Sequence, residues 1–397
     1  MNAEQHVPQF RFKDFSDSWE QRSFKTLYKK VIEKNDLSFE SDRIISVANM
    51  YYKPNDSKSD EKYMETYNIF RLGDIAFEGH KSKNFAYGRF VENTIGDGIV
   101  SHVFDVFRPI SEYDLNYWKY FIHYEDIMGQ KLRMSTTKAT MMNNLVSKDF
   151  LKQSVLVPNL DEQQKIGTFF KQLDHLITLH QRKLAKLKEL KKGYLQKLFP
   201  QNSEKVPEFR FKGYSDAWEK RKLGDLGSVA MNKRIYKDQT SDEGEIPFYK
   251  IGSFGKQADA FISRKLFNEY KKLYPFPKKG DILVSASGSI GRTIVYNGED
   301  AYFQDSNIIW IQHDNRLDNT FLHQLFNIIR WSGVEGTTIK RLYNKNILST
   351  QILLPSVEEQ RSIGSLLDNV DNLIAAIQCK LDLLKKLKKG YLQKMFC

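Results

Sequence analysis

The chain has 397 residues and a net charge of +12 at pH 7. This length allows two globular domains, and the charge favours a polyanionic partner such as nucleic acid, with a basic protein that has no such partner as the alternative. Two cysteines, Cys379 and Cys397, exclude a disulfide framework and a cysteine-based zinc cluster, and they indicate a reduced, cytoplasmic protein. No signal pattern or membrane-length apolar stretch occurs, so no membrane association is expected.

Two stretches of the sequence occur twice. The stretch VPQFRFKDFSDSWEQR at 7–22 returns as VPEFRFKGYSDAWEKR at 206–221. The longer stretch at 156–200 returns at 353–397, and both copies contain the heptapeptide KKGYLQK. The segments between these stretches share little beyond scattered turns. The sequence therefore predicts two tandem halves with a matched frame and divergent inserts, related by an approximate two-fold axis.

The divergent segments, 24–155 and 223–352, are interpreted as mixed α/β domains. Short β-type runs alternate with turn residues in both. One helix is expected in each, around 117–130 and 320–331.

Basic, aromatic and small polar residues gather in the turn regions of both segments. Gly and Ser let the backbone approach phosphate, while Arg, Lys and Asn can reach base edges in a groove. Ordinary hairpin turns and caps use the same residue types, so that interpretation stays open. The candidate DNA-binding residues are Lys81, Lys83, Asn84, Tyr87, Arg89, Lys138, Asn143, Asn144, Ser287, Ser289, Arg292, Thr338, Lys340 and Arg341.

Each copy of the longer repeat predicts a long helix. The starts, Asn159 to Glu162 and Ser356 to Glu359, have the pattern of a capping box. Apolar residues then recur in steps of four and three, which is the heptad seam of a coiled coil. The seam residues are Ile166, Phe170, Leu173, Ile177, Leu184, Ile363, Leu367, Val370, Ile374 and Leu381. His180 interrupts the seam and is interpreted as a residue that sets the register rather than as a ligand.

Charge predicts how these two helices pair. Acidic residues come early in each helix and basic residues come late, so antiparallel packing brings opposite charges together. Pairing within one chain is favoured over a homodimer because closure is then unimolecular. About 38 residues at about 1.5 Å each give a rod of roughly 57 Å, with a globular unit expected at each end. Gly193 of KKGYLQK is expected inside its helix, where it would permit a close approach.

Motifs for self-contained catalysis are missing from the sequence. It has no GxxxxGK[ST], no HExxH and no Pro-Pro pair of an amino-methyltransferase motif. The acidic run at 56–62 is interpreted as a solvated loop. We therefore expect no catalytic residue and no bound metal, and an autonomous nuclease or methylase is disfavoured.

Two repeated helices that space two divergent domains resemble the specificity subunit of type I restriction-modification systems. Phe10, Arg11 and Phe12 with Trp19 carry this resemblance together with their second copies. It is also carried by GDILVS at 280–285, by PNLDEQQKIG and PSVEEQRSIG, and by the doubled Gly-Tyr-Leu-Gln ending. The first domain departs from the pattern, because its GDIAF lacks the GSxG turn that follows GDILVS.

The resemblance implies an α+β fold with two target recognition domains separated by two long antiparallel coiled-coil helices. The implied boundaries are 1–155 and 201–352 for the domains, and 156–200 and 353–397 for the spacer helices. Each domain would read one half of an asymmetric bipartite target in double-stranded DNA. The roughly 57 Å helices would limit the distance between the outer edges of the site to about 17 base pairs.

The resemblance also implies partners. Two modification subunits would methylate adenine with S-adenosylmethionine, and two restriction subunits would translocate and cut DNA with ATP and Mg²⁺. This chain would bind none of these cofactors and would itself be no enzyme. The alternative is a coiled-coil scaffold that assembles partner proteins and does not bind DNA.

Overall fold

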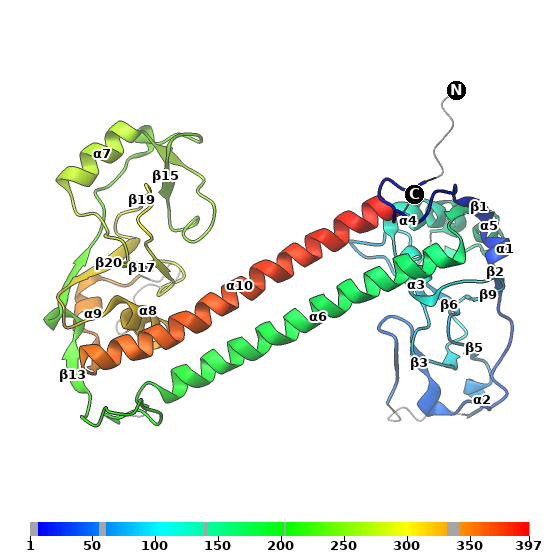
Figure 1. Cartoon of the computed structure of the whole chain (residues 1–397), viewed down its shortest axis with the longest axis horizontal. Coiled ribbons are helices and arrows are strands. Elements are labelled where there is room, and N and C mark those ends of the chain that lie inside the picture. The colour runs from blue at the N-terminus through cyan, green and yellow to red at the C-terminus, as the bar shows by residue number, and fades with distance from the viewer. Residues whose placement is uncertain (1–6, 55–60, 139–141, 202–203, 332–340, 397) are drawn as a thin grey trace. The chain divides into compact units, whose positions relative to one another are not determined.

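The computed structural model describes residues 7–54, 61–138, 142–201, 204–331 and 341–396 (Figure 1). The chain divides into two units, residues 1–181 with 379–397, and residues 182–378. Each unit contains both helices and strands, as the predicted α+β class requires. The two longest helices pass from one unit into the other.

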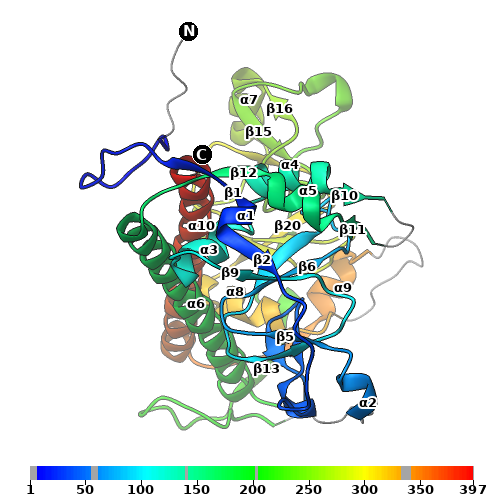
Figure 2. The same cartoon turned by 90° about the vertical axis from the view of Figure 1, so that its right-hand side faces the viewer.

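The first unit is built around a four-stranded antiparallel sheet and faces the viewer in Figure 2. Its order is β2 (Tyr28–Lys30), β9 (Val106–Pro109), β6 (Ile75–Glu78) and β7 (Arg89–Glu92). The other strands form antiparallel pairs: β1 (Glu20–Ser23) with β12 (Ser154–Val157), β3 (Ile45–Ser46) with β4 (Tyr51–Tyr52), β5 (Asn68–Phe70) with β8 (Gly98–Val100), and β10 (Thr136–Thr137) with β11 (Asn144–Leu145). The short helices are α1 (Phe24–Leu27), η1 (Ser41–Arg43), α2 (Glu61–Met64), α3 (Leu115–Phe121), α4 (Glu125–Ser135) and α5 (Ser147–Lys152).

The second unit has a four-stranded antiparallel sheet of the same design. Its order is β14 (Gly227–Ala230), β20 (Ile308–His313), β17 (Ile282–Ser285) and β18 (Thr293–Val295). The remaining strands are β13 (Glu219–Lys222) paired with β21 (Gln351–Leu354), and β16 (Phe261–Ile262), β15 (Ile246–Tyr249) and β19 (Tyr302–Phe303) in a three-stranded sheet. The helices are η2 (Leu223–Asp225), η3 (Lys237–Gln239), α7 (Arg264–Leu273), α8 (Asn319–Ile328) and α9 (Asn344–Ser349). The divergent segments thus share a sheet order, because strand pairing needs alternating apolar residues rather than identical ones.

The expectation of one helix around 117–130 is wrong. The chain forms α3 and α4 there, and Tyr124 between them has an extended backbone (φ −81°, ψ 102°). The break lets Phe121 of the first helix and Met128 of the second both reach the core. The helix expected around 320–331 is α8, which ends at Ile328.

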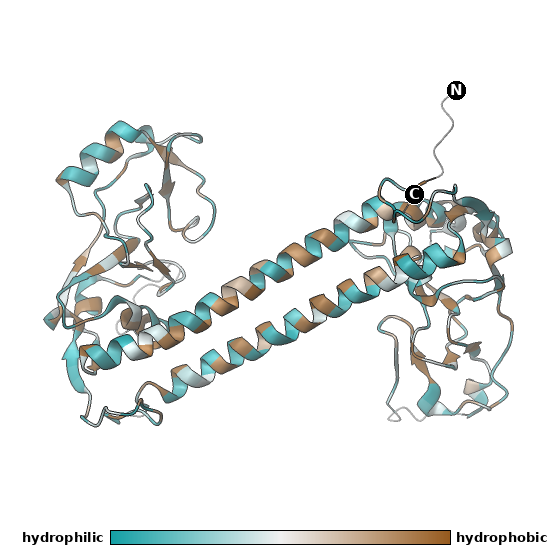
Figure 3. Cartoon of the chain, in the orientation of Figure 1, coloured by the Kyte–Doolittle hydropathy of each residue, from teal (hydrophilic) through white to brown (hydrophobic). Residues whose placement is uncertain are grey.

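The two long helices are α6 (Leu160–Lys197) and α10 (Val357–Met395), and apolar residues recur along both between polar ones (Figure 3). In the first unit, Lys388 near the end of α10 pairs with Asp174 in the first half of α6 at 2.6 Å. In the second unit, Lys191 near the end of α6 pairs with Asp371 in the first half of α10 at 2.7 Å. Late residues meet early residues in both units, so the helices pack antiparallel, as the charge pattern predicts.

The predicted seam residues are mostly covered. Ile374 is half-buried, and the others are buried: Ile166, Phe170, Leu173, Ile177, Leu184, Ile363, Leu367, Val370 and Leu381. His180 is half-buried, and its Nδ1 has no hydrogen-bond partner within the described residues. Burial of these aliphatic and aromatic side chains is what holds the helices against their surroundings in each unit.

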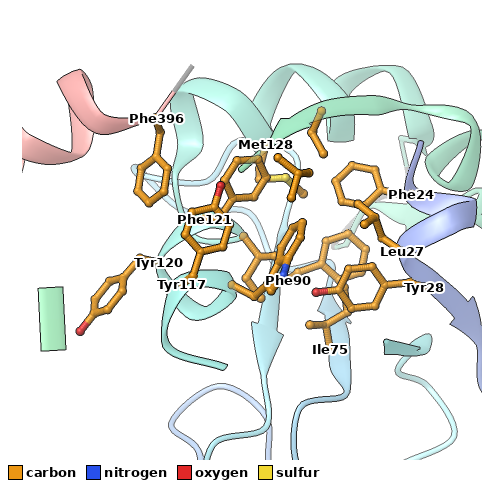
Figure 4. Packing of buried hydrophobic residues seen from close by; sticks show 14 of the residues in the cluster. Phe24, Leu27, Tyr28, Ile75, Phe90, Tyr117, Tyr120, Phe121, Met128 and Phe396 are labelled. Atoms are coloured by element: carbon orange, nitrogen blue, oxygen red, sulfur yellow. The ribbon is translucent and has the colours of Figure 1, made fainter. Parts of the chain in front are cut away.

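The ends of the long helices supply aromatic side chains to the core of each unit. In the first unit, Phe396 points towards Phe121 and Tyr117 (Figure 4), and its ring centroid lies 5.6 Å from each. In the second unit, Phe199 stacks on Phe321 of α8 with centroids 5.3 Å apart. The chain just after each KKGYLQK therefore anchors a helix end in a globular core.

Each long helix has one of the two hydrogen bonds of the predicted capping box. Asn159 Oδ1 accepts from the Glu162 amide at 2.9 Å, and Ser356 Oγ accepts from the Glu359 amide at 3.3 Å. The carboxylate of Glu162, however, is held by Nε and Nη2 of Arg11, both at 2.7 Å. Glu359 is held in the same way by Arg210. A buried carboxylate gains more from a bidentate guanidinium than from one backbone amide, which explains the departure.

The Gln and Gly of the repeated PxxxEQxxIG pattern dock a short helix on each long one. Gln163 Oε1 accepts from the Asp114 amide at 3.1 Å, at the start of α3, while its Nε2 donates to the Pro158 carbonyl at 3.0 Å. At Gly167 a Cβ would lie only 2.6 Å from the Tyr117 nitrogen. Gln360 and Gly364 make the corresponding contacts with the start of α8. The pattern therefore encodes a tight helix crossing that a side chain would block.

Gly193 lies inside α6, as expected, but the expected close approach is wrong. A Cβ at Gly193 would meet nothing within 4 Å, and the same holds at Gly390. The repeated string has other contacts: its first lysine, Lys191 or Lys388, forms the interhelical ion pair described above. The carbonyls of Lys197 and Lys394 accept, both at 2.8 Å, from Phe209 and Phe10 of the shorter repeat.

Candidate nucleic-acid interface

Two hairpins lie side by side in the first unit and carry candidate residues from distant parts of the sequence. The connection between β6 and β7 presents Lys81, Lys83 and Asn84, all exposed. The β10–β11 hairpin presents Lys138 and Asn144, also exposed. The two hairpins are joined by a β-bridge between His80 and Met142. They are also joined by a 2.9 Å hydrogen bond from the Asn143 amide to the Gly79 carbonyl. The fold thus forms one polar, basic surface from both.

Three other candidates in this unit make contacts inside the protein. Asn143 is buried and donates from Nδ2 to the Ala86 carbonyl at 3.2 Å. Tyr87 is half-buried against the main hydrophobic core. Arg89 Nε donates to Glu78 at 2.7 Å, and its guanidinium lies 5.4 Å from the Phe85 ring centroid. Their side chains are engaged within the protein and do not form part of the exposed surface of the two hairpins.

The second unit has an equivalent arrangement. The β17–β18 turn presents Ser289, which is exposed, between Gly288 (φ +64°) and Gly291 (φ +84°). Positive φ favours glycine at both positions, which accounts for the Gly-Ser-Ile-Gly string. A bridge from Ser287 to exposed Arg341 joins this turn to the segment before α9. Thr338 and Lys340 lie outside the described residues.

Two candidates here are again internal. Ser287 is buried and donates from Oγ to Asn307 Oδ1 at 2.7 Å. Arg292 is half-buried, donates to the Ile251 carbonyl at 3.2 Å and lies 5.3 Å from the Phe254 ring centroid. Both stabilise the turn from inside.

The Gly-Asp pair that both units share before the central hairpin is structural. Gly73 (φ +87°) and Gly280 (φ +95°) adopt the left-handed conformation of a tight turn. Asp74 accepts from the Arg71 amide at 2.8 Å, and Asp281 accepts from the Lys278 amide at 2.7 Å. Asp74 is buried, and this burial raises the pKa of its carboxyl despite the hydrogen bonds from Arg108.

A basic and aromatic surface near α7 was not predicted from the sequence. Lys233 Nζ lies 5.0 Å from the ring centroid of Tyr274, which is exposed. Tyr236 is also exposed. The string KKLYPFPKK at 271–279 was the available signal, since it has two aromatic residues between two pairs of lysines. Such surfaces suit phosphate and base contacts.

Each unit also has a surface pocket lined by matched residues of the repeats. The first, of about 330 Å³, is lined by Arg11, Glu20, Arg22 and Asn159 among others. The second, of about 370 Å³, is lined by their counterparts Arg210, Glu219, Arg221 and Ser356. The two units thus present like surfaces at the frame and unlike surfaces at the hairpins. None of the helices among the described residues has the length and apolar character needed to span a membrane.

Comparison with known proteins agrees with these features. The family described as type I restriction modification DNA specificity domain matches residues 7–189 and again residues 215–386. A putative type I restriction enzyme specificity subunit of Haemophilus influenzae is 54% identical over 156 residues, which are 39% of this chain and 40% of that protein. The type I restriction enzyme MjaVIII specificity subunit of Methanocaldococcus jannaschii is 24% identical over 288 residues, 68% of this chain and 67% of that protein.

Solved structures give the same fold. The S subunit of a type I restriction-modification system from M. genitalium matches with a TM-score of 0.61 and 15% identity, over 98% of this chain and 99% of that one. A chain from a study of complex assembly and conformational transition of a type I R-M system matches with a TM-score of 0.52 and 16% identity, over 95% of this chain and 97% of that one. With the family match in both halves, the chain belongs to the family of type I restriction-modification specificity subunits.

Proposed function

We propose that each unit of this chain reads one half of an asymmetric bipartite target in double-stranded DNA. The observation that carries the proposal is the joining of loops from distant parts of the sequence in each unit: two hairpins gather exposed Lys81, Lys83 and Lys138 in the first, and the β17–β18 turn joins the segment before α9, with exposed Ser289 and Arg341, in the second. Lysines would position the duplex through phosphates, while amide and hydroxyl groups would reach base edges. Because the two surfaces differ in sequence and shape, the half-sites should differ.

The matched frame supports a pair of like partners. The pockets at the starts of α6 and α10 have corresponding linings, and Gly193 and Gly390 leave corresponding open positions on the helices. We propose that two modification subunits, which methylate adenine with S-adenosylmethionine, bind these equivalent surfaces. Two restriction subunits that use ATP and Mg²⁺ would complete the complex. This chain would supply the recognition of the DNA sequence and would bind none of those cofactors.

The decisive experiment is methylation by the reconstituted complex of this chain with its modification subunits. The expected result is methylated adenine at one bipartite sequence, mapped across genomic DNA. Replacing the first-unit surface residues should relax or change one half of that sequence and leave the other intact. Equal methylation of random and target DNA would contradict the proposal.

Salt dependence separates DNA reading from a scaffold that binds only proteins. Replacement of Lys81, Lys83 and Lys138 by Gln should lower the slope of log affinity against log salt by roughly 2.7, since each phosphate contact contributes about 0.9. The control replaces three exposed lysines outside these hairpins, Lys25, Lys165 and Lys188, and should leave the slope unchanged. A scaffold would show weak duplex binding and no difference between the two variants.

A further inference from the structure

The two interhelical ion pairs have different surroundings. In the first unit, Asp174 accepts from the Tyr120 hydroxyl of α3 at 2.7 Å and from Lys388 Nζ at 2.6 Å. One carboxylate therefore faces one ammonium and one phenol. The charge of this contact is balanced.

The corresponding contact in the second unit has an additional acid. Asp371 pairs with Lys191 at 2.7 Å, but Asp368 stands one turn earlier on the same face of α10. His323 of α8 faces it, with 3.5 Å between Nδ1 and Asp368 Oδ1. The two carboxylates and one ammonium leave a charge of −1 when the imidazole is neutral. In the first unit, in contrast, the repeat places Lys171 at the position of Asp368, and Lys119 lies as far after Asp114 as His323 lies after Asp318, the two residues whose amides donate to Gln163 and Gln360.

A buried amide reaches into the same cluster. Gln324 is fully buried, and its Nε2 lies 2.9 Å from Asp368 Oδ1, 2.9 Å from Asp371 Oδ2 and 3.3 Å from His323 Nδ1. Its Oε1 has no hydrogen-bond partner within the described residues. Turning this amide would bring Oε1 against two carboxylates, which is favourable only if a cation lies between the oxygens.

We propose that His323, Asp368 and Asp371, with Gln324 beside them, bind one divalent transition-metal ion, of which Zn²⁺ is the best match. One ligand atom from each of the first three residues lies within 4.8 Å of the others. Tetrahedral zinc at about 2.1 Å needs separations of roughly 3.4 Å, which small side-chain rotations supply. One imidazole and carboxylate oxygens suit Zn²⁺ and its neighbours better than Mg²⁺.

The ion would link α8 to α10 in the second unit. At the corresponding place in the first unit, the Tyr120 hydroxyl links α3 to α6 through Asp174. The ammonium of Lys191 competes with it for Asp371. Metal binding would therefore stiffen the second unit selectively, whether or not the chain reads DNA.

The test uses the full chain with Cys379→Ser and Cys397→Ser, which remove thiolate ligands. Co²⁺ absorption and competition by Zn²⁺ measure stoichiometry and affinity. The expected result is one tight equivalent, with affinity at least about tenfold weaker in His323→Ala and in Asp368→Asn. Lys191→Met should bind the metal more tightly than the parent, because the competing ammonium is gone. A variant that only misfolded would instead bind the metal more weakly. Asp174→Asn, which changes the first-unit counterpart of Asp371, should leave the metal affinity unchanged.

Zn²⁺ should also raise the Tm of the parent by several degrees, roughly 2–4 °C for each kcal/mol of binding, and not that of His323→Ala. Equal Co²⁺ and Zn²⁺ binding by the parent, His323→Ala and Asp368→Asn would mean adventitious surface binding and would overturn the proposal. Loss of binding in Asp174→Asn would place the site elsewhere and overturn it as well.

Discussion

The buried arginine–glutamate pairs that fix the shorter repeat on the long helices offer a quantitative test. We expect Arg11→Met and Arg210→Met both to destabilise the chain, because each leaves a carboxylate that is 1% exposed without its guanidinium. Breaking such a pair costs about 3–5 kcal/mol. The two variants differ in one respect: Trp19 Nε1 donates to Glu162 at 3.1 Å, whereas the Trp218 indole has no hydrogen-bond partner within the described residues.

Arg11→Met should therefore cost about 3 kcal/mol, and Arg210→Met about 4–5 kcal/mol, since Glu162 keeps the Trp19 indole as a donor whereas Glu359 has no corresponding indole donor. Hydrogen exchange of peptides covering 7–22 and 206–221, with urea unfolding of the full chain, measures both. Adding Glu359→Met to Arg210→Met should recover most of the loss, because the unpaired buried charge is then gone. Equal costs in the two units, or costs below about 0.5 kcal/mol, would refute this reasoning.

Three further outcomes are expected. Burial raises the pKa of Glu92 well above its ordinary value of 4.5, so the protonated form stabilises the fold and that stabilisation is lost as pH rises from 4.5 through the raised pKa. Glu92→Gln should therefore flatten the dependence of unfolding free energy on pH above 4.5. Gly167→Ala should lower the free energy of unfolding by about 1–3 kcal/mol, because a Cβ there blocks the close helix crossing. Gly193→Ala should raise it by up to about 1 kcal/mol, because alanine favours the helix and the position has open space. Equal changes in Tm for the two variants would contradict this helix geometry. Phe396→Ala should cost about 3–5 kcal/mol by urea unfolding, as should Phe199→Ala, and a negligible loss would show that neither ring anchors its helix.

Local patterns explain what could be read from the sequence about the frame. Ile363, Leu367 and Val370 repeat at heptad spacing, and burial of that face follows from helix geometry alone. The direction of pairing followed from early acids and late bases, and Lys191 with Asp371 bears it out. Such features depend on residues close together in sequence, so they can be predicted without knowledge of the tertiary structure.

The candidate reading surface was only partly predictable. Lys83 and Asn143 look equally suitable as polar loop residues, yet one is exposed and the other is buried against Ala86. Which side of a hairpin faces inward depends on a second hairpin far along the chain. That contact could not be predicted from sequence patterns.

The sequence by itself determined the repeat, the two long helices and the basic character of the chain. Only the tertiary structure decided that Glu162 and Glu359 bind arginines, that Gly193 has open space, and that the divergent segments share one sheet order. The physical reason is that periodicity and charge act along a helix, whereas partner choice for a buried side chain depends on residues brought close by folding.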